Sequence, residues 1–168
     1  MPVVTKTIPL RKPRAVAAPA AEWLALDQQL CFALYSSSLA MTKFYKPLLE
    51  PLGLTYPQYL AMLVLWERDG ATVSELGQRL TLDSGTLTPL LKRLQAGGLL
   101  ARTRDTDDER RVLVRLTAVG RALKSRAMKV PPQVACAAAC PLDELAALTS
   151  RLKQLRDDIS EFSSRAAA

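Results

Sequence analysis

The 168-residue sequence contains no histidine, so it lacks both the commonest general base and the commonest zinc ligand. Its three cysteines, Cys31, Cys136 and Cys140, are an odd number with no apolar export signal ahead of them. That argues against a structural disulfide framework and favours a reducing compartment, the cytoplasm. Three cysteines without histidine also make a poor metal site. We therefore expect no metal, no cofactor, and neither a hydrolytic triad nor a histidine-based metalloenzyme.

Long apolar runs are absent as well, since none approaches the roughly 18 residues that a membrane span needs. Aromatic residues make up 5% of the chain and hydrophobic residues 49%, which predicts a globular protein with a core of Leu, Ala and Val and no membrane partner. The sequence contains neither a βαβ pattern nor a glycine-rich phosphate loop. We therefore expect a mainly α-helical protein.

Basic residues exceed acidic ones by 23 to 16, giving a net charge of +7 and an isoelectric point near 9.6. A basic surplus predicts an anionic partner, of which nucleic acid is the usual one. About half of this surplus lies in residues 1–21, which carry Lys6, Arg11, Lys12 and Arg14 and no acidic residue. We expect these residues to form a disordered basic arm, so evidence for DNA binding has to come from a motif in the folded part.

Two helices are predicted ahead of the central motif. Residues 22–46 carry apolar side chains at helical spacing, and Pro47 should end this helix near the residue before it. The second helix begins at T-Y-P-Q, with Thr55 as N-cap, and runs to about Arg68. Its side chains are apolar nearly all round, which predicts a central, buried helix.

A helix-turn-helix pattern follows. Thr72 opens a short helix with the capping pattern T-V-S-E, and a T-L-D turn leads into a second helix over residues 84–96, which Gly97 closes. Residues 99–104 and 112–117 then form two short strands, with a charged hairpin tip between them. A helix-turn-helix followed by a basic β-hairpin predicts a winged helix.

The C-terminal part is again helical. We expect one helix from Ala118 to about Lys129, a break at Pro131, an ambiguous Ala-rich segment, and a last helix that starts after Pro141. The last helix carries apolar residues at alternating spacings of three and four, a narrow stripe typical of a helix that packs on a partner helix. These residues are Leu142, Leu145, Leu148, Leu152, Leu155, Ile159 and Phe162.

These patterns predict four regions. Residues 1–21 form the arm, residues 22–54 an N-terminal sensor and dimerisation helix with its linker, residues 55–117 the winged helix-turn-helix, and residues 118–168 the C-terminal dimerisation helices. The predicted fold is mainly α, with a two-stranded β-wing and a helical dimerisation region made from the N- and C-terminal helices.

The second helix of the motif is the expected recognition helix. Its first turns present Ser84, Thr86 and Thr88, whose small hydroxyl groups suit approach to base edges in the major groove. Lys92 and Arg93 follow, where they can neutralise phosphates. In an isolated helix such residues are more often a cap and a solvated face. The adjoining turn and wing favour double-stranded DNA as the partner.

At the predicted wing tip, arginines alternate with acidic residues. We hypothesise that Asp108 holds Arg110 by a bidentate ion pair and that Arg110 contacts the minor groove of DNA. The alternative is a hairpin tip whose charges merely neutralise one another in solvent.

The segment D-D-E-R-R-V-L-V-R-L-T at residues 107–117 closely resembles the wing motif of the MarR family of winged-helix regulators. Four further stretches resemble that family's organic-hydroperoxide-sensing branch, the OhrR-type repressors. They are L-C-F-A-L-Y at 30–35, M-T-K-F-Y-K-P-L-L at 41–49, L-T-Y-P-Q-Y-L-A at 54–61 and L-D-S-G-T-L-T-P-L-L-K-R-L at 82–94. The resemblance covers about residues 22–130 and is very specific.

The resemblance implies an obligate homodimer whose first and last helices form the interface and whose wings straddle a pseudo-palindromic operator. It also implies that organic hydroperoxide oxidises Cys31 to a sulfenic acid, that Tyr45 and Tyr56 hydrogen-bond this cysteine, and that the repressor then leaves DNA. Cys136 best matches the resolving cysteine of the two-cysteine subclass, which the other subunit supplies for a disulfide. Cys140 matches no such position and is either a spectator or an alternative partner.

Without the resemblance, the residues themselves support peroxide sensing by Cys31 less strongly. Apolar neighbours such as Phe32 and Phe44 suit an organic peroxide, yet a lone helical cysteine is more often part of a core. Three other functions stay open: a MarR-type repressor released by a bound small molecule, with Cys31 inert; a thiol peroxidase that uses Cys31 and Cys136; and a helical dimerisation module. The winged helix favours a regulator over an enzyme.

Overall fold

The computed structural model describes residues 24–106, 108, 110–138 and 141–166. The predicted basic arm, residues 1–21, lies outside these residues. The chain divides into two compact units, one up to Lys43 and one from Phe44 onward. The described part of the first unit contains one turn of 3-10 helix, η2 (Leu26–Gln28), and the larger part of helix α1 (Leu30–Leu49).

The first long helix differs from its prediction at both ends. α1 starts at Leu30, because the backbone is extended at Ala25 and Gln29 on either side of η2. At the other end Pro47 lies inside α1, so the expected stop before this proline was wrong. The helix continues because Leu49 is fully buried in the core, which offsets the one backbone hydrogen bond that proline cannot donate.

The helix-turn-helix region consists of α2 (Tyr56–Glu67), β1 (Ala71–Thr72), α3 (Val73–Leu80) and α4 (Ser84–Ala96). Capping boxes at Thr55 and Thr72 start α2 and α3, which confirms both predictions. Between α3 and α4, Thr81 has a left-handed backbone with φ of 56°, and the Leu82 N–H donates to the Gly77 carbonyl at 2.9 Å. These features fix the path of the chain between the two helices.

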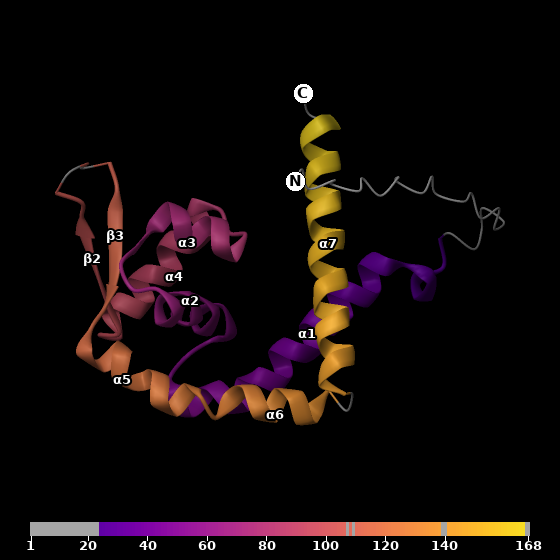
Figure 1. Ribbon diagram of the computed structural model, residues 1–168, viewed down its shortest axis with the longest axis horizontal. Coiled ribbons are helices and arrows are strands. Elements are labelled where there is room, and N and C mark those ends of the chain that lie inside the picture. The colour runs from indigo at the N-terminus through magenta and orange to yellow at the C-terminus, as the bar shows by residue number, and fades with distance from the viewer. Residues whose placement is uncertain (1–23, 107, 109, 139–140, 167–168) are drawn as a thin grey trace, which may run out of the picture. The chain divides into compact units, whose positions relative to one another are not determined.

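The wing is a hairpin of β2 (Leu100–Arg104) and β3 (Val112–Leu116), which stands beside α3 and α4 in Figure 1. β3 is the middle strand of a three-stranded antiparallel sheet of order β1-β3-β2. Ala71 of β1 pairs with Val114, and Leu100 of β2 pairs with Leu116. The sequence predicted only the two wing strands, because a two-residue strand shows no alternation of polar and apolar side chains.

Three helices complete the chain, α5 (Ala118–Ala127), α6 (Val130–Ala137) and α7 (Leu142–Ala166). Pro131 and Pro132 occupy the first turn of α6, where an N–H has no helical partner, so they begin a new helix. The Ala-rich segment is therefore helical through Cys136, whereas Cys140 lies outside the described residues. α7 follows Pro141 as predicted. No helix in the described ranges is long and apolar enough to cross a membrane.

The hydrophobic core of the second unit is built around α2. Tyr59, Ala61, Met62 and Leu65 of this helix are buried, which confirms the prediction of a central helix. α2 contacts α3, α4 and α5, and these helices and the sheet supply most of the other buried side chains. The core thus holds the helix-turn-helix, the root of the wing and α5 together.

Gly120, in the first turn of α5, has no room for a side chain. A Cβ at this position would lie 1.9 Å from the carbonyl oxygen of Leu99, which accepts the backbone N–H of Thr117 at 3.1 Å. Gly120→Ala should therefore push α5 away from the sheet and lower the free energy of unfolding by about 3 kcal/mol. Urea denaturation followed by circular dichroism measures this loss.

Gly97→Ala is the matched control, because its Cβ would meet carbonyl oxygens only at 3.5 Å and 3.6 Å, which are ordinary contact distances. We expect this substitution to change the free energy of unfolding by less than about 0.5 kcal/mol. Equal losses in the two variants would contradict a steric clash at Gly120.

Candidate DNA interface and thiol-sensing site

A groove of about 880 Å³ lies between the helix-turn-helix and the wing. Its helical wall contains Ser84 and Thr88 of α4. Its opposite wall contains Arg102, Arg110 and Arg111 of the wing hairpin. The fold therefore brings hydroxyl groups of the predicted recognition helix and arginines of the wing to one surface.

Asp83 caps α4, the predicted recognition helix. Its Oδ1 accepts the backbone N–H of Thr86 at 2.8 Å, and its Oδ2 accepts the Thr86 hydroxyl at 2.9 Å. These hydrogen bonds lower the pKa of Asp83, so a full negative charge sits at the helix N-terminus. Because the Thr86 proton is donated to Asp83, the hydroxyl oxygen remains able to accept from a DNA donor. Sequence reasoning placed Asp83 in a turn and missed this cap, although Asp is a preferred N-cap residue.

The five residues predicted for α4 fall on two of its faces. Ser84, Thr88 and Lys92 recur at four-residue spacing and share one face, whereas Thr86 and Arg93 share another. All are exposed except Thr88, which is half-buried. Four buried leucines on the remaining surface fix α4 in the core. The helix can therefore present both sets of polar groups without moving.

The wing tip is held mainly by backbone contacts. Asp108 Oδ1 accepts the backbone N–H of Arg110 at 3.0 Å, and the Asp108 carbonyl accepts the N–H of Arg111 at 2.9 Å. In the described part of the wing, the expected bidentate pair between the Asp108 carboxylate and the Arg110 guanidinium is not formed, because the carboxylate closes the turn instead. Asp105 pairs with Arg111 at 3.7 Å. Asp108 thus shapes the turn that carries the exposed Arg110.

Arg102 is oriented by a residue that sequence reasoning did not identify. Its Nε donates to Gln95 Oε1 at 2.7 Å, which ties strand β2 to the last turn of α4. Ser74 and Gln78 of α3 also line the groove. They were missed because a sequence does not distinguish them from other polar residues on an exposed helix face.

Three tyrosines form a cluster where α1 ends and α2 begins. The rings of Tyr45 and Tyr56 have centroids 4.6 Å apart, and Tyr59 lies 5.9 Å from Tyr45 and is 2% exposed. Burial, helped by the neighbouring tyrosines, raises the pKa of Tyr45 to about 12, and burial raises the pKa of Tyr56 and of Tyr59. All three phenols are therefore protonated at neutral pH and can donate hydrogen bonds. Tyr59 was not predicted.

The cysteines lie in different units. Cys31, in the first unit, is exposed, and its thiol donates to the Gln29 side-chain oxygen at 3.9 Å. Cys136, in the last turn of α6, is a free and exposed thiol of the second unit. The fold brings Tyr45 and Tyr56 together, whereas a hydrogen bond from either tyrosine to Cys31 remains a prediction.

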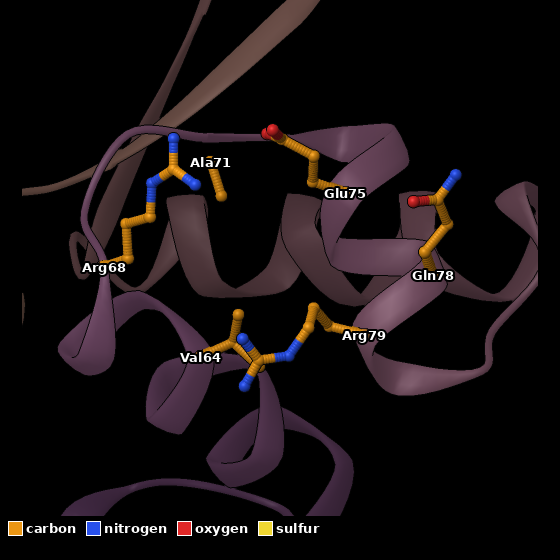
Figure 2. Close-up of a pocket in the computed structure, with 6 residues that line it drawn as sticks. All are labelled: Val64, Arg68, Ala71, Glu75, Gln78 and Arg79. Carbon is orange, nitrogen blue, oxygen red and sulfur yellow. The ribbon is translucent and has the colours of Figure 1, made fainter. Parts of the chain in front are cut away.

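A smaller pocket of about 300 Å³ lies between α2 and α3 (Figure 2). Arg68, Glu75 and Arg79 are its charged side chains. Arg79 pairs with Glu67 at 2.6 Å, and Glu75 accepts the backbone N–H of Thr72 at 2.7 Å. None of the predicted site residues lines this pocket, so we assign it no function.

The sequence is similar to those of known transcriptional regulators. The family model for the transcriptional regulators SarA/Rot matches residues 43–127. The organic hydroperoxide resistance transcriptional regulator of Bacillus subtilis is 56% identical over 108 residues, which are 64% of this chain and 74% of that protein. The HTH-type transcriptional regulator TtmR of Methylorubrum extorquens is 50% identical over 135 residues, which are 80% of this chain and 69% of that protein.

The fold is also similar to solved structures of AbfR from Staphylococcus epidermidis. Reduced AbfR bound to DNA matches with a TM-score of 0.69 at 34% identity, covering 83% of this chain and 96% of that one. AbfR in a disulfide form matches with a TM-score of 0.58 at 35% identity, covering 80% of this chain and 95% of that one.

The tyrosine cluster predicts a loss of stability at alkaline pH. Tyr45 has a pKa of about 12 in the fold against an ordinary value of 10, so the folded protein holds a proton that the unfolded chain releases. The contribution of this proton to the free energy of unfolding is complete below pH 10 and is lost as the pH rises toward 12. We expect the free energy of unfolding, measured by urea denaturation, to fall over this range. Tyr45→Phe should show a shallower fall, and identical slopes for the two proteins would contradict the shift.

Proposed function

Because the chain belongs to the MarR family of winged-helix, DNA-binding transcriptional regulators, we propose that it is a repressor released by organic hydroperoxides. A homodimer binds a pseudo-palindromic operator, and oxidation of Cys31 ends this binding. The observation that best supports the redox function is the pair Tyr45 and Tyr56, whose ring centroids lie 4.6 Å apart with the rings tilted by 39°, and whose pKa values burial raises. One relative is an organic hydroperoxide resistance regulator, and AbfR is known in reduced and disulfide forms.

The groove supports a specific docking mode on DNA. Ser84, Thr86 and Thr88 carry short side chains, which let α4 come close to base edges in the major groove. Lys92 and Arg93 follow and neutralise phosphates. Arg110, at the tip of the hairpin, enters the adjacent minor groove. The protein therefore reads DNA with α4 and holds its register with the wing.

A homodimer is supported by apolar side chains that a single chain leaves exposed. Along α7, Leu148, Leu152 and Ile159 are 55%, 40% and 54% exposed and belong to the predicted apolar stripe. On α1, Leu30 and Leu34 are 57% and 38% exposed. Burying exposed apolar side chains of this kind against a second copy is favourable. We infer that α1 and α7 form the dimer interface.

The proposed sensing reaction is a two-electron oxidation. The Cys31 thiolate attacks the terminal oxygen of the hydroperoxide ROOH, and the O–O bond breaks. Cys31 becomes a sulfenic acid, and the leaving alkoxide takes a proton from solvent to become the alcohol ROH. Tyr45 and Tyr56 donate hydrogen bonds that stabilise the thiolate. The thiol of Cys136 in the other subunit then attacks the sulfenic sulfur, which releases water and forms an intersubunit disulfide.

The disulfide ends DNA binding through geometry. Two recognition helices that read consecutive turns of DNA must lie about 34–36 Å apart. A covalent bridge that involves α6 changes this spacing, and a shift of a few ångströms removes contacts to bases and phosphates. A difference of about 3 kcal/mol between the two states gives roughly a hundredfold change in affinity.

Cumene hydroperoxide added in stoichiometric amount should lower the affinity of the wild-type protein for operator DNA by about a hundredfold. Dithiothreitol should restore it, because the disulfide is reversible. Cys31→Ser should bind as tightly as the reduced wild type but show no response. Fluorescence anisotropy with labelled DNA measures both. A Cys31→Ser protein that still responds to the inducer would indicate control by a bound ligand instead.

Two further variants distinguish Cys136 from Cys140 after the same peroxide treatment. Non-reducing electrophoresis should show a covalent dimer for peroxide-treated wild type and Cys140→Ser, and none for Cys136→Ser. A dimer that persists in Cys136→Ser would assign the resolving function to Cys140. Consumption of many peroxide equivalents per dimer, with a thiol reductant present, would instead support a thiol peroxidase.

Arg110→Ala should lower operator affinity about tenfold at moderate salt, since an arginine contact to DNA contributes about 1–3 kcal/mol. Arg79→Ala removes the same charge from α3 outside the groove, where Arg79 pairs with Glu67, and should leave affinity unchanged. Anisotropy titrations of both variants make the comparison. Unchanged affinity in Arg110→Ala would exclude the minor-groove contact.

A further inference from the structure

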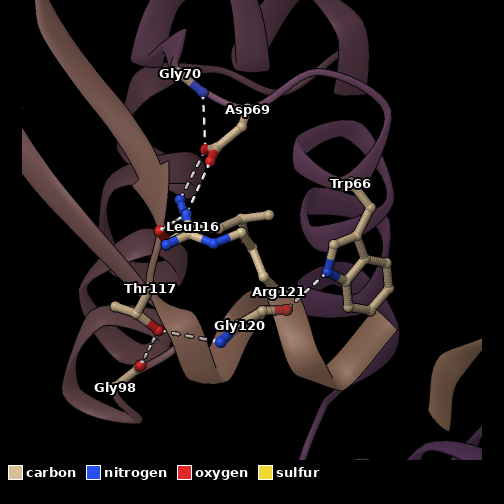
Figure 3. A network of polar contacts seen from close by, with 8 residues as sticks. All are labelled: Trp66, Asp69, Gly70, Gly98, Leu116, Thr117, Gly120 and Arg121. Carbon is tan, nitrogen blue, oxygen red and sulfur yellow. Dashed lines mark hydrogen bonds and ion pairs between the residues drawn. The ribbon is translucent and has the colours of Figure 1, made fainter. Parts of the chain in front are cut away.

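Asp69, in the turn after α2, joins three segments of the second unit (Figure 3). Its Oδ1 accepts the backbone N–H of Gly70 at 2.9 Å and that of Leu116, the last residue of β3, at 2.8 Å. Its Oδ2 lies 3.2 Å from the guanidinium of Arg121 in α5, which also donates to the Leu116 carbonyl at 2.7 Å. One carboxylate therefore fixes the end of α2 to the wing strand β3 and to α5.

Trp66 adds a second connection between α2 and α5. Its indole N–H donates to the Gly120 carbonyl at 2.8 Å, and Lys124 Nζ donates to the Trp66 carbonyl at 2.9 Å. The Thr117 hydroxyl donates to the Gly98 carbonyl at 2.6 Å and accepts the Gly120 N–H at 3.0 Å. The first two turns of α5 are thus bound to α2, to the end of β3 and to the turn after α4.

Two parts of the proposed sensor belong to the second unit, the tyrosine cluster and Cys136, and each is connected to these contacts. Tyr59 packs 6.3 Å from Trp66 and 5.9 Å from Tyr45, measured between ring centroids. In the other direction α5 leads into α6, where Val130 is 3% exposed and Cys136 follows six positions later. The tyrosines are therefore connected to the end of α2 by ring packing, and the thiol-bearing helix α6 is connected to α5 by the chain and by the burial of Val130 in the same core.

We propose that Trp66, Asp69 and Arg121 are positioning residues that make α5 and the wing move as one body, so that a disulfide at Cys136 displaces the wing from DNA. This function of the three residues rests on the proposed redox sensing. Without their contacts, the start of α5 stays attached to the root of the wing through the backbone, Thr117 and the close packing of Gly120 on Leu99, but the side-chain links from the end of α2 to β3 and α5 are lost. When α6 moves, the start of α5 then shifts relative to β3, and the wing stays in its DNA-binding position.

The three positions allow signal transmission to be separated from folding. The side chains of Arg121 and Asp69 are 59% and 37% exposed, so losing their ion pair has little effect on stability. Trp66→Phe keeps an aromatic ring but removes the indole N–H donor. Glu67→Gln is the matched control, because Glu67 is also ion-paired at the end of α2, but to Arg79 within the helix-turn-helix.

The experiment compares the full-length wild type, Glu67→Gln and the double variant Trp66→Phe/Arg121→Gln on a DNA fragment that the reduced wild type binds. Anisotropy titrations are made before and after cumene hydroperoxide. We expect the reduced proteins to bind within about threefold of one another. Oxidation should then lower affinity by about a hundredfold in the wild type and the control, but by about tenfold or less in the double variant. Non-reducing electrophoresis should show the same disulfide in all three.

An undiminished hundredfold loss in the double variant would overturn the proposal. The proposal would also be overturned if the reduced double variant bound DNA more weakly than the wild type by as large a factor as its response to oxidation is diminished. Contacts that only stabilise the DNA-binding fold would give that result. A wild type whose affinity ignores oxidation would overturn the proposed redox function, and this inference with it. The wild type and the double variant thus report on the two proposals separately.

Discussion

The carbonyl of Leu99 approaches α5 so closely that only glycine fits opposite it, and the position of the wing depends on this contact. The oxygen accepts the Thr117 N–H at 3.1 Å and would lie 1.9 Å from a Cβ at Gly120. Thr117 in turn caps α5 by accepting the Gly120 N–H. Strand β3 therefore passes directly into α5. The root of the wing and the start of the C-terminal helices are held by the same few atoms.

The winged region, residues 55–117, is almost neutral, with nine basic and eight acidic residues, which is unexpected for a surface that binds DNA. In the fold several of these acids shape the backbone. Glu75 accepts the Thr72 N–H at the start of α3, and Asp83 caps α4. Their hydrogen bonds lower the pKa of both carboxyls, so the charges persist. Each carboxylate accepts a backbone N–H at the start of a helix, which would otherwise lack a partner. These acids therefore stabilise the helices that line the groove opposite its arginines.

Local signals predicted the start of α3, which the capping pattern at Thr72 marks, and the end of α4, which Gly97 marks. Pro47 was misjudged, since burial of Leu49 outweighs one missing hydrogen bond and only the tertiary structure shows that burial. The contact between Trp66 and Gly120 joins residues 54 positions apart, and no local pattern encodes such a pair. The helix-turn-helix motif predicted the position of α4 and of its hydroxyl residues, whereas their contacts with DNA stay a prediction. The function of Cys31, by contrast, came from resemblance, because its own helix pattern fits a core residue equally well.

A chain without histidine has to activate a sensor thiol by donors and not by a neighbouring imidazole. Tyr45, with its pKa raised to about 12 by burial, does not accept a proton from Cys31 at neutral pH, because that would require a phenolate. In the proposed sensor it stabilises a thiolate that has lost its proton to solvent. In that sensor the tyrosines affect the rate of oxidation but not the choice of oxidant, because a stabilised thiolate reacts with any peroxide that reaches it. In the proposed sensor, the apolar residues predicted beside Cys31 make that choice, because they favour an alkyl or aryl hydroperoxide over hydrogen peroxide.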